Sequence, residues 1–290
     1  MPKLMEVITK ELLSQLDVFA IRMESLLVNG YSGARKSKAQ GMSLEFSDFR
    51  PYVLGDDLRR IDWNSYGRFD KPFLKLFMEE KQGNVNVFLD NSMSMDDSEI
   101  SKIFYGKHLA AAIAYIGLRN MDVVNLYACG RTINAEKKNI KSKNLFYDVV
   151  KFLDELPLDR ETTLTQSIMS LKNYPMAQGI SFILSDFFSQ DGYEEAVKLL
   201  QYKKQQVVLV QILSPEELNP SLRGYYRLTD QESGEFKDIE LTESTIEAYK
   251  KALKEFQIQI QSFCQKRGQQ YVCLSTDIPI LTGLKKCLGE

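Results

Sequence analysis

Short apolar runs alternate with amphipathic stretches from residue 85 to the end of the chain. The apolar runs have the length and β-branched content of buried strands, and they cover residues 85–90, 122–128, 180–185, 206–213 and 270–274. Between them, apolar residues at helical spacing predict helices over residues 98–119, 143–155, 164–173, 192–202 and 243–266. A short strand near 131–134 and a polar hairpin of residues 225–229 and 236–241 complete the pattern. Strands that alternate with helices form crossover units, so the sequence predicts an α/β fold with a doubly wound, mostly parallel sheet.

The first 80 residues have a different pattern. They predict an N-terminal helical and loop extension, residues 1–80, in front of a main domain of residues 81–290. Residues 3–27 show apolar positions at helical spacing, and residues 73–79 alternate as a strand does. Between them lies a glycine-rich loop with the basic residues Arg35, Lys36 and Lys38. This loop is either a solvated surface segment or a contact for an anionic partner.

Residues 46–70 combine dense charge with aromatic side chains and the only tryptophan, Trp63. The charged residues of both signs are Arg50, Asp56, Asp57, Arg59, Arg60, Asp62 and Arg68. Because arginine pairs with carboxylates in a bidentate way, we interpret the segment as a set of structural braces. A catalytic acid cluster is the alternative, since structural networks and active sites both perturb carboxylates. A docking surface over Arg50–Trp63 also stays open.

Composition and charge narrow the class of protein. Apolar residues make up 44% and charged residues 26%, and the net charge of −2 counts against nucleic acid as a partner. The four cysteines form no CxxC pair, which argues against a zinc site and suits reduced thiols. The N-terminus lacks the apolar core of a signal peptide, and the longest uncharged run, residues 109–118, is too short to span a bilayer. We therefore expect a soluble, cytoplasmic protein.

Oxygen-bearing side chains follow two of the predicted strands. Asp90, Ser92 and Ser94 come directly after strand 85–90, and Asp186 follows strand 180–185. Thr162 lies in a hydroxyl-rich loop that opens a helix. If these loops share one edge of the sheet, the five side chains meet in the crevice where ligands of such sheets bind. Hard oxygen donors suit Mg²⁺ or Mn²⁺, and so few charged ligands leave the ion able to attract a carboxylate or phosphate from another molecule.

Other chemistry is conceivable for the same residues. Each of them alone could instead cap a helix. Asp90 could be the nucleophile of a phosphoaspartyl transferase, but that chemistry wants a second carboxylate two residues on, where Ser92 stands. The only histidine, His108, falls within a predicted helix, where a packing role is favoured over a general base. No G-x-S-x-G motif of a serine hydrolase occurs.

Two motifs resemble known families. The Asp90-x-Ser92-x-Ser94 element, with Thr162 and Asp186, resembles the metal-ion-dependent adhesion site of von Willebrand factor A domains, and on that alignment Thr162 rather than Thr163 is the ligand. The segment from Glu45 to Trp63 resembles the signature of the bacterial domain-of-unknown-function family 58.

These resemblances imply a Rossmann-like sheet flanked by helices, as in von Willebrand A domains. They also imply that the serines and the threonine bind the ion directly, whereas the aspartates act largely through water. Members of the family are often encoded beside MoxR-type AAA+ ATPases, which implies joint action in the assembly or maturation of other proteins.

Together these observations favour a non-enzymatic, metal-dependent protein-interaction module. The expected partner is a MoxR-type AAA+ ATPase or its client, which would complete the metal coordination with an acidic residue. Two alternatives stay open: a metal-dependent phosphatase or hydrolase that uses the same site, and a binder of anionic ligands or nucleic acid through residues 35–38. A steep salt dependence of binding would identify the last of these.

Overall fold

Six strands form the central sheet of the protein, in the order β10-β7-β6-β3-β4-β5. Their bounds are β3 (Asn84–Asp90), β4 (Val123–Cys129), β5 (Ile133–Ile140), β6 (Gly179–Ser185), β7 (Gln205–Leu213) and β10 (Gln270–Ser275). Neighbouring strands are parallel, except that the edge strand β5 runs antiparallel to β4. The predicted doubly wound, mostly parallel sheet is confirmed.

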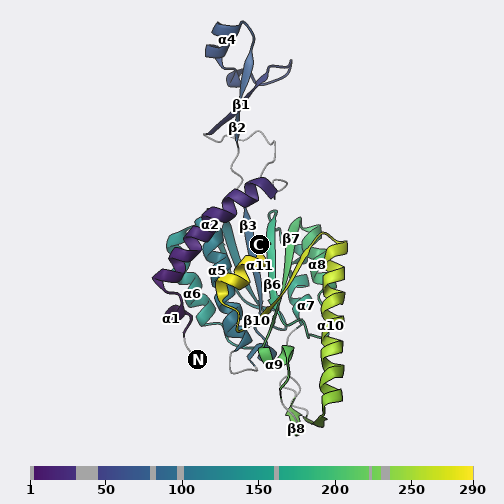
Figure 1. Cartoon of the computed structure of the whole chain (residues 1–290). Helices are drawn as coiled ribbons and strands as arrows, with labels where there is room; N and C mark the ends of the chain where they lie inside the picture. The colour runs from purple at the N-terminus through teal and green to yellow at the C-terminus, as the bar shows by residue number, and fades with distance from the viewer. Residues whose placement is uncertain are drawn as a thin grey trace. The chain divides into compact units, whose positions relative to one another are not determined.

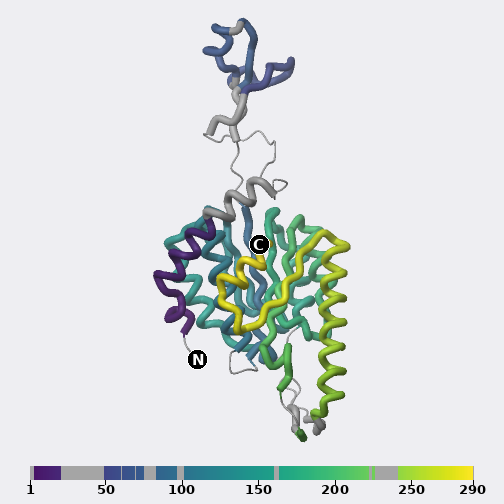
Figure 2. The backbone as a smooth tube through the Cα atoms, in the orientation of Figure 1, coloured from purple at the N-terminus to yellow at the C-terminus, as the bar shows by residue number. Residues whose placement is uncertain are grey.

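The computed structural model describes residues 3–30, 45–78, 83–96, 101–159, 163–221, 224–229 and 236–289 (Figure 1). Figure 2 traces the backbone of the chain in the same orientation. The chain forms two compact units. The larger contains Met1–Glu24 and Gly83–Glu290, and the smaller contains Ser25–Gln82. The basic residues Arg35, Lys36 and Lys38 lie outside the described residues.

Helices cover both faces of the large sheet (Figure 1). One face carries α5 (Lys102–Arg119), which packs against β3 and β4 and also contacts α1 (Leu4–Val7), α6 (Phe146–Asp154) and α11 (Ile280–Cys287). The other face carries α7 (Leu164–Met169), α8 (Glu194–Tyr202) and α10 (Glu243–Lys266). A helix layer on each face explains why these strands read as nearly continuous apolar runs.

Consecutive residues of β3 illustrate the two cores. Phe88 stacks on Tyr127 with ring centroids 4.8 Å apart, within the apolar cluster beneath α7, α8 and α10. Leu89 points to the opposite face, where α5 approaches so closely that a Cβ atom on Gly106 would lie 2.9 Å from the Leu89 side chain. This tight contact holds the N-terminal part of α5 against the end of β3.

Several predicted elements differ in extent. The helix expected over residues 3–27 is two helices, α1 and α2 (Lys10–Gly30), because the Thr9 hydroxyl accepts a hydrogen bond from Leu12 N and starts a new helix. The helices expected over 143–155 and 164–173 include the 3₁₀ turns η3 (Lys143–Leu145) and η4 (Ser170–Asn173). The strand expected near 131–134 is longer, since its polar, solvent-facing positions hide an edge strand in the sequence.

Some elements were not predicted at all. Two short helices of the larger unit were missed, α9 (Pro215–Leu218) and α11.

The hairpin predicted over residues 225–229 and 236–241 forms as β8 (Gly224–Thr229) and β9 (Phe236–Leu241). Within the described ranges, no helix combines the length and the apolar character that crossing a bilayer requires.

The smaller unit contains a two-stranded antiparallel sheet of β1 (Glu45–Pro51) and β2 (Phe73–Met78), with η1 (Leu58–Arg60) and α4 (Trp63–Phe69) between them. The predicted bidentate brace forms between Arg50 and Asp56, whose two N–O contacts measure 2.7 and 2.6 Å. Asp57 accepts a hydrogen bond from Arg59 N, and Asp62 caps α4 through Asn64 N and Ser65 Oγ. These carboxylates therefore have structural partners, which favours the brace over a catalytic acid cluster.

Candidate metal site at the carboxyl edge of the sheet

The candidate site lies between the neighbouring parallel strands β3 and β6 (Figure 1). Asp90 is the last residue of β3, and Asp186 directly follows the last residue of β6. From β3 the chain proceeds through α5 to β4 on one side, and from β6 it proceeds through α8 to β7 on the other. This reversal of strand order is the topological switch point, where open α/β sheets bind their ligands.

Asp90 is buried, with 1% of its surface exposed, and hydrogen bonds fix both of its carboxylate oxygens. Oδ1 accepts from Ser92 N at 3.1 Å, and Oδ2 accepts from the Ser185 hydroxyl at 2.6 Å. Burial, together with the negative charge of Asp186, raises the pKa of Asp90 to about 6, although the hydrogen bonds from Ser185 and Ser92 oppose this rise. Asp90 therefore bears a charge at neutral pH that its surroundings disfavour.

The two serines of the motif lie next to each other. The Ser92 and Ser94 hydroxyl oxygens are 2.9 Å apart, and Ser94 is the second residue of the 3₁₀ turn η2 (Met93–Asp96). Backbone hydrogen bonds hold this loop: Met93 N donates to Asp159 O at 2.9 Å, and Asp159 N donates to Asn91 O at 2.8 Å. The hydroxyl pair is thus presented by a pinned loop rather than by a free one.

Asp186 has 2% of its surface exposed and is likewise held at both oxygens. Phe188 N donates to Oδ1 at 3.0 Å, and the ammonium of Lys102 donates to Oδ2 at 3.0 Å. The next residue, Phe187, has a left-handed φ of 62°, which turns the chain sharply away from the strand end.

Lys102 and Glu217 belong to this cluster, although the sequence did not single them out. Lys102 has 2% of its surface exposed, and its Nζ lies 2.6 Å from Glu217 Oε1 as well as 3.0 Å from Asp186. Burial would lower the pKa of Lys102, but the charges of Asp186 and Glu217 outweigh it and raise the pKa. When all four groups are ionised, three carboxylates and one ammonium leave a net charge of −2.

Thr162 lies outside the described residues. The residues on either side of that gap lie at the same edge of the sheet. Asp159 pairs with the loop after β3, and Thr163 N and Oγ1 donate to the carbonyls of Gly130 and Arg131, just beyond β4. The Thr163 hydroxyl is thereby occupied with the main chain, at 2.9 Å from Arg131 O.

The described side chains fit a hard divalent cation. Two hydroxyls 2.9 Å apart adjoin two buried carboxylates, and the surrounding net charge of −2 equals the charge that such an ion would neutralise. Among the described residues, no group of three or more His, Cys, Asp or Glu could hold a metal ion by those side chains alone. Hydroxyl and carboxylate oxygens are ligands that suit Mg²⁺ or Mn²⁺ better than Zn²⁺.

His108 is not paired with this cluster. In the described part of the chain its Nε2 has no hydrogen-bond partner, whereas the Ser92 hydroxyl bonds to that of Ser94. Burial lowers the pKa of His108 to about 4, so the imidazole is neutral at physiological pH. This arrangement agrees with a packing role for His108.

One feature of the sequence could have revealed Lys102. It shares a helical face with Gly106 and Leu109, at spacings of four and seven residues, and both of these are buried. A lysine at a core-facing position is rare unless it is paired. Ser185 was visible as the residue before Asp186, but nothing in the local sequence around Glu217 links it to Lys102.

Comparison with known proteins agrees with the motif of residues 45–63. The profile of a family described as "Protein of unknown function DUF58" matches residues 48–258. Uncharacterized proteins of Mycobacterium tuberculosis and Mycobacterium bovis are 19% identical over 242 residues, which cover 82% of this chain and 76% of theirs.

Solved structures show weaker likeness. A conserved hypothetical protein, BatB from Bacteroides thetaiotaomicron, is 15% identical, with a TM-score of 0.42 over 71% of this chain and 95% of its own. The SpRpn10 VWA domain is 11% identical, with a TM-score of 0.39 over 70% of this chain and 93% of its own.

Proposed function

Because the chain belongs to the DUF58 family, whose function is unknown, we propose from its site that it is a metal-dependent protein-interaction module. In this proposal Asp90, Ser92, Ser94, Thr162 and Asp186 hold Mg²⁺ or Mn²⁺. An aspartate or glutamate of a partner protein then completes the coordination of the ion.

The observation that supports this proposal most directly is the charge of the site. Asp90, Asp186, Glu217 and Lys102 leave a net charge of −2 beside the two serine hydroxyls, at the switch point of the sheet. Asp90, Asp186 and Lys102 are buried whereas Glu217 is a quarter exposed, and buried carboxylates that lie close together are costly unless a counter-charge meets them. A divalent cation supplies that counter-charge, and its remaining coordination position favours an anionic ligand from outside.

The residues of the chain prepare the site for such an ion. The Ser185 hydroxyl and Ser92 N orient the Asp90 carboxylate, and Phe188 N orients that of Asp186. Such orienting groups commonly change metal affinity by 10- to 100-fold when they are removed. The Ser92 and Ser94 hydroxyls, which are hydrogen-bonded to each other at 2.9 Å, would offer their remaining lone pairs to the ion.

The family resemblance also suggests the partner and the compartment. We propose a MoxR-type AAA+ ATPase, or a protein on which it acts, as the source of the acidic residue. The four cysteines are free thiols, three of them buried, which suits a reducing compartment such as the cytoplasm.

Titration calorimetry with Mn²⁺ and Mg²⁺ tests the metal site. Wild type should bind one ion, Ser92→Ala should lose most of the affinity, and Ser189→Ala should match wild type. Ser189 is a fair control because its hydroxyl bonds to Asp191 and not to the site. Equal binding by wild type and Ser92→Ala would refute the assignment.

A binding assay with a purified MoxR-type ATPase tests the interaction. Retention by wild type in Mg²⁺, with loss in EDTA and in Ser92→Ala, would support the module. Mg²⁺-dependent turnover of p-nitrophenyl phosphate that is lost in Asp90→Ala would replace it by a metal-dependent phosphatase.

A further inference from the structure

Asp186 already has a cationic partner in the protein. The Lys102 ammonium lies 3.0 Å from Asp186 Oδ2, and both side chains have 2% of their surface exposed. An ion at the proposed site would draw on the same carboxylate. The Asp186 carboxylate would then be shared between the metal ion and the Lys102 ammonium, which belongs to α5.

The second carboxylate on Lys102 leads to another element. Glu217 Oε1 lies 2.6 Å from Lys102 Nζ, and its other oxygen, Oε2, accepts from Ser214 N at 2.7 Å. Glu217 N in turn donates to the Ser214 hydroxyl at 3.1 Å, which closes the capping box of α9. The Glu217 carboxylate therefore joins the buried ammonium to the first turn of α9.

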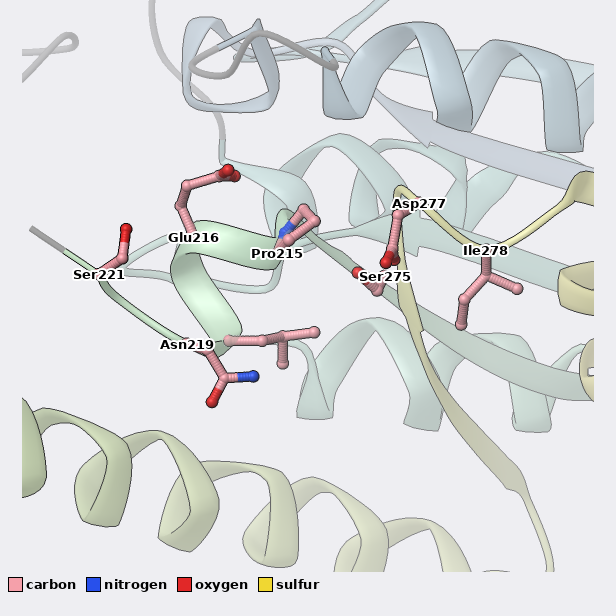
Figure 3. Close-up of a pocket in the computed structure, with 8 residues that line it drawn as sticks. Pro215, Glu216, Asn219, Ser221, Ser275, Asp277 and Ile278 are labelled. Carbon is pink, nitrogen blue, oxygen red and sulfur yellow. The ribbon is translucent and has the colours of Figure 1, made fainter.

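Helix α9 also forms one wall of a pocket of about 470 Å³ (Figure 3). Pro215, Glu216, Leu218 and Asn219 come from α9 and the residue after it, and Ser275 and Asp277 come from the end of β10 and the turn beyond. The pocket thus opens at the same edge of the sheet as the candidate metal site, since β7 and β10 end there.

We propose that Lys102 couples occupancy of the metal site to α9. Lys102 is too buried for water to replace a lost partner, so an ion that draws charge from Asp186 leaves the ammonium more dependent on Glu217. The contact between Lys102 and Glu217 then tightens, and α9 is held more firmly beside its pocket. This inference rests on the proposed metal site and adds a route by which the ion alters the neighbouring surface.

The same geometry predicts that the charges of Lys102 and Glu217 have opposite effects on the affinity for the ion. Lys102→Met removes a positive charge that competes for Asp186, so Mn²⁺ should bind at least tenfold tighter. In Glu217→Gln the Lys102 ammonium keeps Asp186 as its one charged partner and competes more strongly with the ion for it, so Mn²⁺ should bind at least fivefold weaker. Glu216→Gln is the matched control, because it removes the same charge from the same helix at an exposed residue that has no bond to Lys102.

Hydrogen exchange measured by mass spectrometry reports on α9 itself. In wild type and in Glu216→Gln, Mn²⁺ should slow amide exchange in residues 216–218 at least threefold. In Lys102→Met and in Glu217→Gln, the ion should leave that exchange unchanged. Melting curves without metal confirm that each variant is folded, and Glu217→Gln alone carries the test if Lys102→Met does not fold.

The outcomes separate this inference from the proposed function. Equal Mn²⁺ affinity in wild type and in both charge variants overturns the coupling and leaves the metal site standing. Slowed exchange that persists in Glu217→Gln also overturns it. Absence of Mn²⁺ binding to wild type overturns the metal site and the coupling together.

Discussion

Replacing Asp90 by asparagine should stabilise the metal-free protein while abolishing its binding of metal. The Asp90 carboxylate is fully buried, and folding raises its pKa from 3.8 to about 6. At 1.36 kcal/mol for each pKa unit, this difference corresponds to about 3 kcal/mol lost when the folded protein ionises Asp90. Asparagine is nearly the same shape and carries no charge, so Asp90→Asn should recover about 2–3 kcal/mol at pH 7 in EDTA.

The pH dependence follows from the sign of that change. Because the folded protein holds the Asp90 proton more tightly than the unfolded chain does, the favourable contribution is complete below about pH 4 and is lost as the pH rises through 6. The stability difference between Asp90→Asn and wild type should therefore be widest at pH 7 to 8. It should close as the pH approaches 4.

Thermal unfolding of Asp90→Asn and wild type in EDTA, followed by circular dichroism, measures this difference in stability. The melting temperature of Asp90→Asn should be about 5 °C higher than that of wild type at pH 7. With Mn²⁺ at about 100 times its Kd, wild type should gain about 2.7 kcal/mol and Asp90→Asn nothing. Asp186→Asn makes the same chemical change but deprives Lys102 of a partner, so it should cost about 1–3 kcal/mol in EDTA. An Asp90→Asn protein that is less stable than wild type in EDTA at pH 7 would refute this reasoning.

Three further changes test the structure around the site. Gly130→Ala would place a Cβ atom 2.8 Å from Asp159 Cβ, so it should destabilise the protein by about 1–3 kcal/mol in urea unfolding. Asn86→Ala should cost about 1–3 kcal/mol in the same assay, because the buried Asn125 amide loses its acceptor and Gln205 Oε1 keeps only the Ser181 hydroxyl as a donor. Ser185→Ala removes the hydrogen bond that orients Asp90, so calorimetry should show at least tenfold weaker Mn²⁺ binding with little change in fold.

The central strands could be predicted because burial on both faces makes them short, continuous apolar runs. β3, β6 and β7 are nearly all buried, and each was expected to within about one residue. The edge strand β5 was predicted only as a short strand near residues 131–134, because most of its residues are polar and partly exposed and it pairs with β4 on one side only. The short helix α9 was not predicted because a helix of a single turn shows no repeating pattern of apolar residues.

The residues of the candidate site likewise divide into those that a local sequence pattern reveals and those that it does not. Asp90, Ser92 and Ser94 are local in sequence, and the rule that ligands gather at the carboxyl ends of parallel strands links them to Asp186. Lys102 and Glu217 are separated by 115 residues, and no local pattern links a lysine on one helix to a glutamate on another. Their pairing arises from tertiary packing of α5 and α9 at one edge of the sheet.

The distribution of charge around the site therefore could not be derived from its motif. The motif alone supplies two carboxylates, which would match a divalent cation without help. The structure adds one further carboxylate, Glu217, and one ammonium, Lys102, which leave the same net charge of −2 but distribute it over a second helix. An ion at the motif would thus act on a charge network larger than its own ligands. This is why substitutions at Lys102 and Glu217, which are not in the motif, should shift the affinity for the ion in opposite directions.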